Sequence, residues 1–366
     1  MAQKLSKLTI NNFKSIKQTD IELKNINIVI GANGAGKSNF ISFFKMLNCL
    51  IEQRLQDYIN SKKGADAILY NGLKGSAELK FNLSFGVNHY GAILKPAQDN
   101  LFFSKERISF ENSMGNQNVH DIDLSGSETG LFEYKNKMQR LQGYRGIVGY
   151  VIDSLKSWKN FHFHDTSDTA KIKQPNELHD NREFKEDGSN LAAFLYFLQQ
   201  RHFEQFTLIE NTIKLILPYF KRFKLEPLAL NPNLIRLEWE ENCSAKLFNA
   251  FHLSDGSLRM ICLITLLLQP QPPICLIIDE PELGLHPAAI ELLANLIQKA
   301  ADRSQLIVAT QSVALLNYFD PDDVIVADKT TDGTTLQRLN KDDLSEWLTD
   351  YSLGTIWEKN LIGGNP

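Results

Sequence analysis

The stretch Gly31-Ala-Asn-Gly-Ala-Gly-Lys37-Ser38 decides the fold class of this 366-residue chain. It matches in full the pattern G-x-x-x-x-G-K-[ST], whose glycines let the backbone curl so that its N–H groups point inward around phosphates. The preceding run 27–30 (NIVI) predicts a short strand, and apolar residues at helical spacing predict a helix that starts near Lys37. A strand, a glycine-rich turn and a helix N-terminus in this order predict a phosphate-binding loop.

The loop also predicts which side chains would contact a nucleotide. Lys37 would reach the β- and γ-phosphates, and the hydroxyl of Ser38 would ligate Mg²⁺. We therefore expect ATP and Mg²⁺ as cofactors. The expected nucleotide contacts in and beside the loop are Asn33, Gly34, Ala35, Gly36, Lys37, Ser38 and Asn39.

A second motif is the run Ile274-Cys-Leu-Ile-Ile-Asp279-Glu280, which predicts a buried strand ending in two carboxylates. Continuous apolar strands are typical of parallel sheets that are covered on both faces. Such sheets bind ligands beyond the carboxyl ends of their strands. We expect Asp279 to coordinate Mg²⁺ through water and Glu280 to activate the attacking water, because adjacent strand residues point in opposite directions.

The segment Leu253-Ser254-Asp255-Gly256-Ser257 precedes an apolar helix that is predicted over 257–268. It resembles the signature motif of ABC-type ATPases, whose usual form is LSGGQ, although Asp255 departs from the usual glycine. The resemblance implies that Ser254 and Gly256 close over the nucleotide of a partner subunit. The alternative is an ordinary helix cap, since Ser and Asp are common at that position.

Two further segments follow the acidic pair. The segment 281–287 (PELGLHP) resembles the part of ABC-type enzymes that links the two active sites of a dimer. Gln311, in 309–312 (ATQS), stands where ABC transporters carry a histidine that senses the γ-phosphate. An amide can hydrogen-bond a phosphate or a water molecule but has no useful pKa for proton transfer. We therefore expect Gln311 to be a catalytic-site sensor rather than a base; the alternative is a polar residue at a strand end.

Taken together, these motifs resemble the SMC/RecF-like branch of ABC-type ATPases, and the similarity covers nearly the whole chain. The segments that carry it are LTINNFKSI (8–16), IVIGANGAGKSNF (28–40), LSDGSLR (253–259), DEPELGLHP (279–287) and ATQS. WEKNLIGGNP (357–366) and DGSNLAAFL (187–195) also resemble bacterial ATPases of this branch, related to PtuA-type and overcoming-lysogenization-defect ATPase domains. The resemblance implies a head-to-head dimer around two ATP–Mg²⁺, or a higher even-numbered oligomer. It also implies that Lys14 lies beside the nucleotide.

The expected fold class is α/β, a discontinuous ABC-type P-loop ATPase head. An N-terminal mixed β half-sheet (1–169) would carry the phosphate loop. A helical lobe (170–268) would end in the signature motif, and a parallel α/β part (269–366) would supply Asp279, Glu280 and Gln311. The pattern of apolar residues predicts strands at 4–10, 20–23, 77–85, 235–239, 305–309 and 324–328, helices at 145–160, 187–217 and 288–300, and a loop at 111–130.

Composition and charge exclude several classes of protein. A hydrophobic content of 43% excludes disorder throughout. No apolar stretch approaches the ~20 residues that a membrane span needs, and the N-terminus lacks the apolar core of a secretory signal, so we expect a cytoplasmic protein. A net charge of −4 limits DNA binding to a local patch. No two of the four cysteines have CxxC spacing, which favours free thiols at Cys49, Cys243, Cys262 and Cys275.

Three weaker signals remain open. Phe161-His162-Phe163-His164-Asp165 is expected to be an ordinary strand or turn rather than a metal site. The basic run 221–224 (KRFK) is either a solvated surface or a patch that contacts DNA or a partner. Gln139 or Gln142 would be the loop glutamine that reaches Mg²⁺, and the sequence does not decide between them.

Two functional hypotheses follow. The first is a slow ATPase that regulates or scaffolds a separate effector, a nuclease, in bacterial antiphage defence; it rests on the expectation that no nuclease domain follows residue 324 and that the chain does not cut DNA itself. The alternative is a RecF-type DNA-repair ATPase that binds DNA directly. A transporter ATPase is disfavoured by the glutamine at 311 and by the FKS segment at 13–15.

Overall fold

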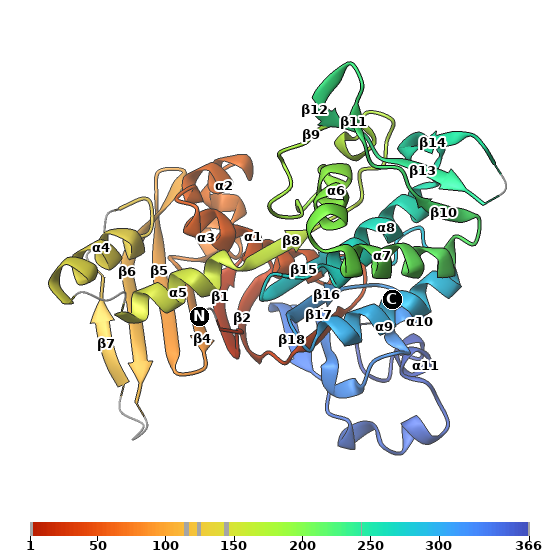
Figure 1. Cartoon of the computed structure of the whole chain (residues 1–366). Coiled ribbons are helices and arrows are strands. Elements are labelled where there is room, and N and C mark those ends of the chain that lie inside the picture. The colour runs from red at the N-terminus through yellow and green to blue at the C-terminus, as the bar shows by residue number, and fades with distance from the viewer. Residues whose placement is uncertain (1–2, 113–116, 123–125, 143–145, 243, 365–366) are drawn as a thin grey trace.

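Two six-stranded sheets form the framework of the computed structural model (Figure 1), which describes residues 3–112, 117–122, 126–142, 146–242 and 244–364. The central sheet has the order β18-β17-β3-β16-β15-β8, in which β18 alone is antiparallel to its neighbour. Its strands are β3 (Ile26–Ile30), β8 (Trp158–Phe161), β15 (Cys275–Asp279), β16 (Gln305–Ala309), β17 (Val324–Thr330) and β18 (Gly333–Arg338).

The second sheet is antiparallel throughout, in the order β2-β1-β4-β5-β6-β7. Its strands alternate buried and exposed side chains, as in β4, because one face packs on the core and the other meets solvent. The strands are β1 (Lys7–Phe13), β2 (Ile16–Glu22), β4 (Leu79–Phe85), β5 (Asn88–Ala97), β6 (Asn100–Glu111) and β7 (Gln117–Asp121).

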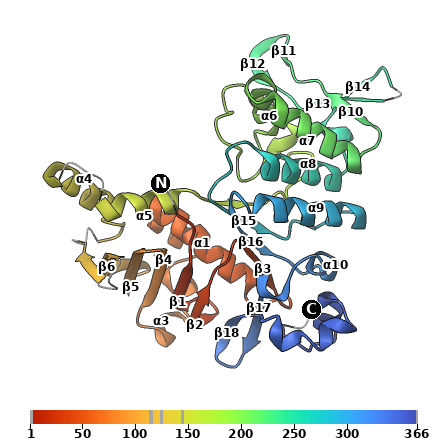
Figure 2. The same ribbon diagram turned by 60° about the horizontal axis from the view of Figure 1, so that its bottom comes forward.

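The central sheet separates two hydrophobic cores, which explains why its strands are apolar at consecutive positions. On β15, Leu276 and Ile278 face a core that contains α8 (Asp255–Leu268) and α9 (Pro287–Ala300). Ile277 faces the other core, which contains α1 (Lys37–Ile51), α5 (Gly146–Lys156) and the antiparallel sheet. Figure 2 shows α8 and α9 stacked on one side of the sheet and α1 on the other.

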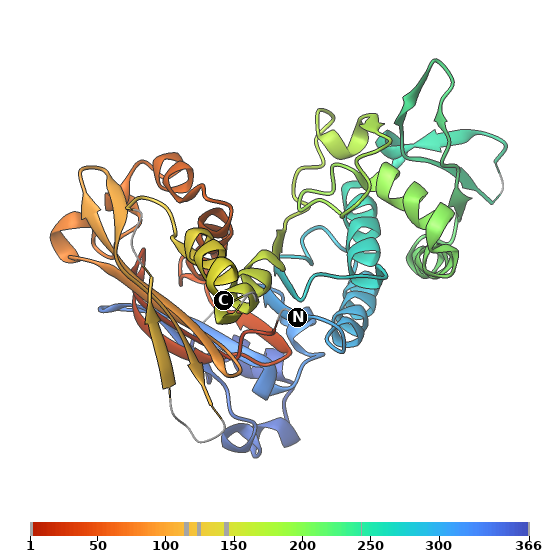
Figure 3. The ribbon, with the colours of Figure 1, turned by 60° about the vertical axis from the view of Figure 1, so that its left-hand side comes forward.

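A third region, which contains α6 (Leu191–Arg201) and α7 (Phe203–Ile216), projects away from the antiparallel sheet (Figure 3). It lies within the segment 170–268, which was expected to be a helical lobe, and it contains two small three-stranded sheets that the sequence pattern does not predict. These are β10 (Phe220–Phe223), β13 (Glu238–Glu241) and β14 (Leu247–Asn249), and β11 (Pro227–Leu228), β12 (Asn231–Ile235) and β9 (Asn176–Glu177).

The remaining helices lie at the edges of these layers. Among the described residues, no helix is both long enough and apolar enough to span a bilayer. The helices are α2 (Leu55–Ser61), α3 (Gly72–Gly75), α4 (Leu131–Gln142), α10 (Val313–Leu316) and α11 (Leu353–Glu358).

Several expectations about single elements are wrong. The segment expected as a loop contains β7, and the segment expected as a helix up to residue 160 ends in β8. The predicted helix 187–217 is two helices that break at His202. The predicted strand 235–239 is divided between β12 and β13, and α8 begins at Asp255 rather than at residue 257.

The strand before the phosphate loop also lies elsewhere than expected. β3 is not part of the N-terminal antiparallel sheet but pairs with β16 and β17 in the central sheet. The reason is that β3 is buried on both faces, and only the central sheet offers two covered faces.

Candidate functional site

The phosphate loop connects β3 to α1, and two of its glycines are required by close contacts. Gly31 has φ 152°, and a Cβ there would lie 2.3 Å from the carbonyl oxygen of Ala327. Gly36 has φ 115°, and its Cβ would lie 2.2 Å from the hydroxyl of Thr334. Any larger residue would therefore push the loop away from β17 and β18.

Lys37 lies inside the loop and is 5% exposed. Its Nζ donates hydrogen bonds to the carbonyls of Gly31 and Ala32, the second at 3.0 Å. Burial lowers the pKa of Lys37, while the nearby carboxylates of Glu280, Asp279 and Glu282 oppose that shift. A buried ammonium at the start of a helix, surrounded by main-chain groups, is a suitable environment for phosphate.

The N-terminus of α1 fits an anion for a second reason. Gly36 is its N-cap residue, no side chain caps it, and no acidic residue lies in its first turn. The first N–H groups of a helix have no partner within the helix, and the helix dipole places partial positive charge there. The loop and α1 therefore have the donors and the charge that a triphosphate needs.

The carboxylate pair lies at the same edge of the sheet because the parallel strands are in register. Asp279 pairs with Ala309 of β16, and Ala309 pairs with Val29 of β3. Burial raises the pKa of Asp279, and the charge of Glu280 raises it further. A bound cation would relieve both effects.

Glu280 is held in a left-handed conformation, with φ 44°. Its N–H donates to the carbonyl of Ala309 at 2.8 Å, and its Oε1 accepts a hydrogen bond from Nε2 of Gln311. The structure therefore brings together Glu280, which was expected to activate water, and Gln311, which was expected to be a sensor. A non-glycine residue at positive φ costs free energy and is often found at functional sites.

The donors present fit Mg²⁺ rather than a metal held by protein side chains alone. Among the described residues, no group of three His, Cys, Asp or Glu side chains could hold a metal ion. Mg²⁺ commonly takes one or two protein oxygens and completes its shell with water and substrate phosphates. Ser38 and Asp279 would be those protein ligands.

The signature segment forms the N-terminus of α8. Oγ of Ser254 accepts a hydrogen bond from the N–H of Ser257 at 3.2 Å, so Ser254 is the N-cap residue. Oδ1 of Asp255, the acid where the ABC-type pattern has glycine, lies 3.7 Å from Nζ of Lys173. A Cβ on Gly256 would lie 2.3 Å from the carbonyl oxygen of Gly284, so this position requires glycine.

Arg259 connects three segments at the site, although no sequence motif marks it. From α8 it donates to three carbonyls, those of Phe163 (3.1 Å), His164 (2.9 Å) and Leu283 (2.9 Å). It thereby joins the segment after β8, the loop after β15 and the signature helix. An arginine five residues after a serine cap carries no distinctive sequence signal.

Lys14 lies in the turn between β1 and β2, on the side of α1. Its Nζ donates to Oγ of Ser42 at 2.8 Å, and burial lowers its pKa to about 8. The neighbouring Ser15 accepts a hydrogen bond from Asn39 at 2.7 Å and lies 2.7 Å from the hydroxyl of Thr334. The FKS segment, α1 and β18 therefore meet around the phosphate loop.

Of the two candidates for the loop glutamine, the structure places only Gln139. Gln139 lies on α4, which packs against α5 beside the antiparallel sheet, and the side chain of Gln142 lies outside the described residues. The strand next to β15 is β8, and the residues that follow it are His162, Phe163 and His164. A protonated His164 would lower the pKa of the Asp279 carboxyl, so this segment borders the site.

The remaining candidates lie away from the phosphate loop. Lys221 and Arg222 both pair with Glu240, and Lys224 pairs with Glu226, so two nearby acids offset part of the charge of the basic run. Cys262 and Cys275 are buried free thiols and Cys49 is a half-buried one, whereas Cys243 lies outside the described residues.

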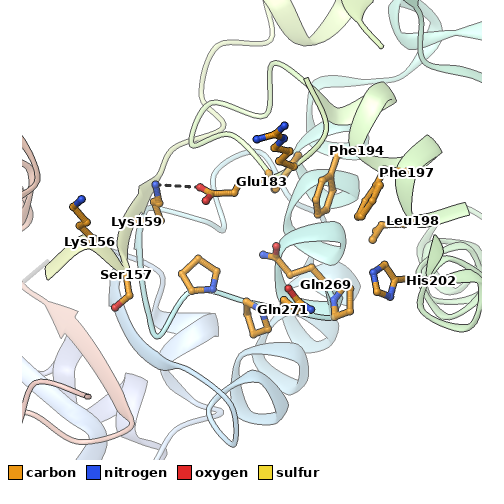
Figure 4. A pocket seen from close by; sticks show the side chains of 15 residues that line it. Lys156, Ser157, Lys159, Glu183, Phe194, Phe197, Leu198, His202, Gln269 and Gln271 are labelled. Atoms are coloured by element: carbon orange, nitrogen blue, oxygen red, sulfur yellow. Dashed lines mark ion pairs between the residues drawn. The ribbon is translucent and has the colours of Figure 1, made fainter. Parts of the chain in front are cut away.

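A cleft of about 390 Å³ lies at the opposite edge of the central sheet (Figure 4). Phe194, Phe197 and Leu198 of α6 line one side of it, and Lys159 pairs with Glu183 at 3.4 Å on the other. Ser157 and Pro273, which precede β8 and β15, also line it. It is therefore separate from the site at the carboxyl ends of the same strands.

Comparisons with known proteins bear on the family and the fold of the chain. Residues 139–317 match the family described as "AAA domain, putative AbiEii toxin, Type IV TA system". No curated protein matches the chain in sequence.

Solved structures of SMC heads resemble the whole chain. An Smc head bound to the C-winged helix domain of ScpA is 15% identical, covers 93% of this chain and 99% of its own, and has a TM-score of 0.56. An Smc head domain with an extended coiled coil from Pyrococcus furiosus, bound to the C-terminal domain of ScpA, is 13% identical, covers 94% and 98%, and has a TM-score of 0.50. The predicted fold class, an ABC-type P-loop ATPase head, is thereby confirmed.

Proposed function

We propose that this chain is an ATPase that binds ATP and Mg²⁺ at the phosphate loop and hydrolyses the β–γ bond. One observation carries the proposal: the loop around Lys37, the pair Asp279–Glu280 and the side chain of Gln311 meet at one edge of the central sheet. The SMC-head fold and the match to an AAA family support it.

Each residue has a role that its position supports. Lys37 and the N–H groups at the start of α1 would neutralise and orient the β- and γ-phosphates. Mg²⁺ bound by Ser38 and Asp279 would supply charge stabilisation to the phosphoryl oxygens. Glu280 would accept a proton from the attacking water, and the amide of Gln311 would fix the orientation of that carboxylate.

We further propose that two copies act head to head, as a dimer or a higher even-numbered oligomer. Ser254 and Gly256 lie at the start of α8 and would bind the nucleotide held by the partner copy. Ser254 is exposed, so it is accessible to a second copy. In this proposal the chain divides into the lobes 1–169, 170–268 and 269–366.

For the biological role we propose a slow ATPase that regulates a separate effector, a nuclease, in cytoplasmic antiphage defence, without nuclease activity of its own. The solved Smc heads bound to domains of ScpA support the idea that a head of this fold engages another protein. The alternative is a DNA-repair ATPase that binds DNA directly. The ion pairs that offset most of the positive charge of the run 221–224 favour the first proposal.

Two variants test the ATPase proposal. Lys37→Ala should abolish binding of a fluorescent ATP analogue, because it removes the cation inside the loop. Glu280→Gln should retain binding but block turnover, and should elute from a sizing column as an ATP-trapped dimer. Lys80→Ala, an exposed change on β4, is the control. Unchanged affinity in Lys37→Ala, or wild-type turnover in Glu280→Gln, would overturn the assignment.

A further inference from the structure

Glu282 is a largely buried carboxylate to which the proposed chemistry assigns no role. It lies two residues after Glu280, in the loop that leads from β15 to α9. Its Oε1 accepts hydrogen bonds from the hydroxyl of Thr310 at 2.6 Å and from the N–H of Gln311 at 3.1 Å. Its Oε2 is buried and has no hydrogen-bond partner among the residues that the structure describes. Burying a carboxylate costs free energy unless hydrogen bonds compensate for it.

The two donors belong to the loop after β16, the strand next to β15. Thr310 is itself fixed, because its Oγ1 accepts a hydrogen bond from the N–H of Ser312 at 2.9 Å while its O–H is donated to Glu282. Glu282, in the loop after β15, therefore binds two consecutive residues of the loop after β16, Thr310 and Gln311. The contact sets the path of the backbone on which the side chain of Gln311 is mounted.

A further hydrogen bond connects Gln311 to Glu280. The side-chain amide of Gln311 donates to Oε1 of Glu280, and the N–H of Glu280 donates to Ala309. Glu280 has φ 44°, in the left-handed region that a non-glycine residue disfavours, so these contacts help to hold it in an unfavourable backbone conformation. The hydrogen bond from this amide occupies one carboxylate oxygen of Glu280, so the other oxygen is left to receive a proton from water.

We propose that Glu282 is a positioning residue for hydrolysis, which holds Gln311 so that its amide aims the carboxylate of Glu280. This inference rests on the proposed ATPase function and adds a residue to it. Glu282 touches neither the nucleotide nor the water in this proposal, and its effect passes through Gln311. It should therefore change the turnover rate and leave nucleotide affinity unchanged.

Three single variants test the contact from both sides. Glu282→Ala removes the acceptor and should lower kcat by about tenfold or more, because small displacements of a catalytic group are costly. Glu282→Gln keeps an acceptor at Oε1 and should restore most of that rate. Thr310→Val removes one donor, leaves Glu282 in place, and should cause a smaller loss. Affinity for a fluorescent ATP analogue should match that of the wild type in all three.

A double-mutant cycle tests the route through Gln311. Gln311→Ala removes the amide but keeps the N–H that Glu282 binds. If Glu282 acts through the side chain of Gln311, adding Glu282→Ala to Gln311→Ala should cause little further loss. Fully additive losses, or a loss of nucleotide affinity in Glu282→Ala, would overturn the proposal.

Amide hydrogen exchange gives a readout that does not depend on hydrolysis. The N–H of Gln311 should exchange faster in Glu282→Ala and keep its wild-type rate in Glu282→Gln. Unchanged exchange in Glu282→Ala would overturn the positioning role even in an active enzyme. A wild-type chain that binds ATP but never hydrolyses it would instead overturn the proposed function, whatever the exchange result.

Discussion

At the scale of single residues, Lys14 shows how the surroundings change the pKa of a side chain. The sequence indicates Lys14 as a nucleotide contact only through the family resemblance. It has φ 48°, and its ammonium lies 5.4 Å from the ring of Phe13 and 5.9 Å from that of Tyr58. Burial is the main cause that lowers its pKa to about 8, and the charges of Lys62 and Lys45 add to it. Lys14 therefore changes charge near physiological pH.

This pKa predicts a pH dependence of nucleotide binding. Below pH 8 Lys14 is mostly charged and would attract phosphate; as pH rises through 8 it loses its proton, so the affinity for an ATP analogue should fall. The fall can approach about tenfold per pH unit in the limit where only the charged form binds. Titrations of affinity between pH 7 and 9.5 measure it.

Lys14→Arg is the matched control, because arginine keeps its charge over this range. This variant should bind the ATP analogue with little pH dependence. The comparison also distinguishes the effect of Lys14 on affinity from that of Lys37. If the wild type and Lys14→Arg lost affinity in parallel, Lys14 would not be a nucleotide contact.

At the scale of elements, Arg259 makes α8 part of the site rather than a helix that only packs against it. The helix is held to the segments after β8 and after β15 by hydrogen bonds to three carbonyls. The N-terminus of α8 also contacts the loop after β15, where Gly256 lies against Gly284. A movement of α8 should therefore move the loop that carries Glu282.

Replacing Arg259 should weaken both stability and turnover. Arg259→Met keeps the length of the side chain but leaves three carbonyls without their donor, which should cost about 2 kcal/mol or more of unfolding free energy. Urea unfolding and ATP turnover measure the two effects, and Arg201→Met, an exposed change on α6, is the control. A stable Arg259→Met with full turnover would show that α8 and the loop move independently.

At the scale of the whole molecule, the site is assembled by the order of strands in the central sheet. β3, β16, β15 and β8 are neighbours in space, although they come from the beginning, middle and end of the chain. Because they are parallel, their carboxyl ends meet at one edge, and that edge collects Lys37, Asp279, Glu280 and Gln311. The signature residues lie beside this edge, at the start of α8.

The proposed head-to-head dimer predicts that two inactive variants complement each other. In a mixed dimer of Lys37→Ala and Ser254→Arg, one site carries both lesions and the other carries neither. Equal mixing with random pairing gives about half mixed dimers, each with one intact site, so about a quarter of wild-type turnover should return. Turnover is measured after mixing, with mixed dimers verified by two affinity tags.

The control mixes Lys37→Ala with the double variant that carries both changes, since this pair offers no intact site. It should show no recovery. If the first mixture also showed none, with folded variants and verified mixed dimers, Ser254 would not serve the partner's nucleotide and Leu253–Ser257 would be only a helix cap.

The sequence by itself determined the local motifs, and through them the fold class, because each motif is a pattern of residues close along the chain. The loop Gly31–Ser38 needs its glycines and lysine at fixed spacing, and the strand that ends in Asp279 needs a continuous apolar run. Both leave a pattern that can be recognised without the structure.

Only the tertiary structure decided which side chains from distant segments meet. Glu282 binds the loop after β16, Thr334 approaches Gly36, and His164 follows the strand beside β15. Pairing between strands far apart in the chain places them there, and no local periodicity encodes that pairing. A position along the chain likewise does not fix a position in space. Gln139, a candidate for the loop glutamine by its place in the sequence, lies on α4.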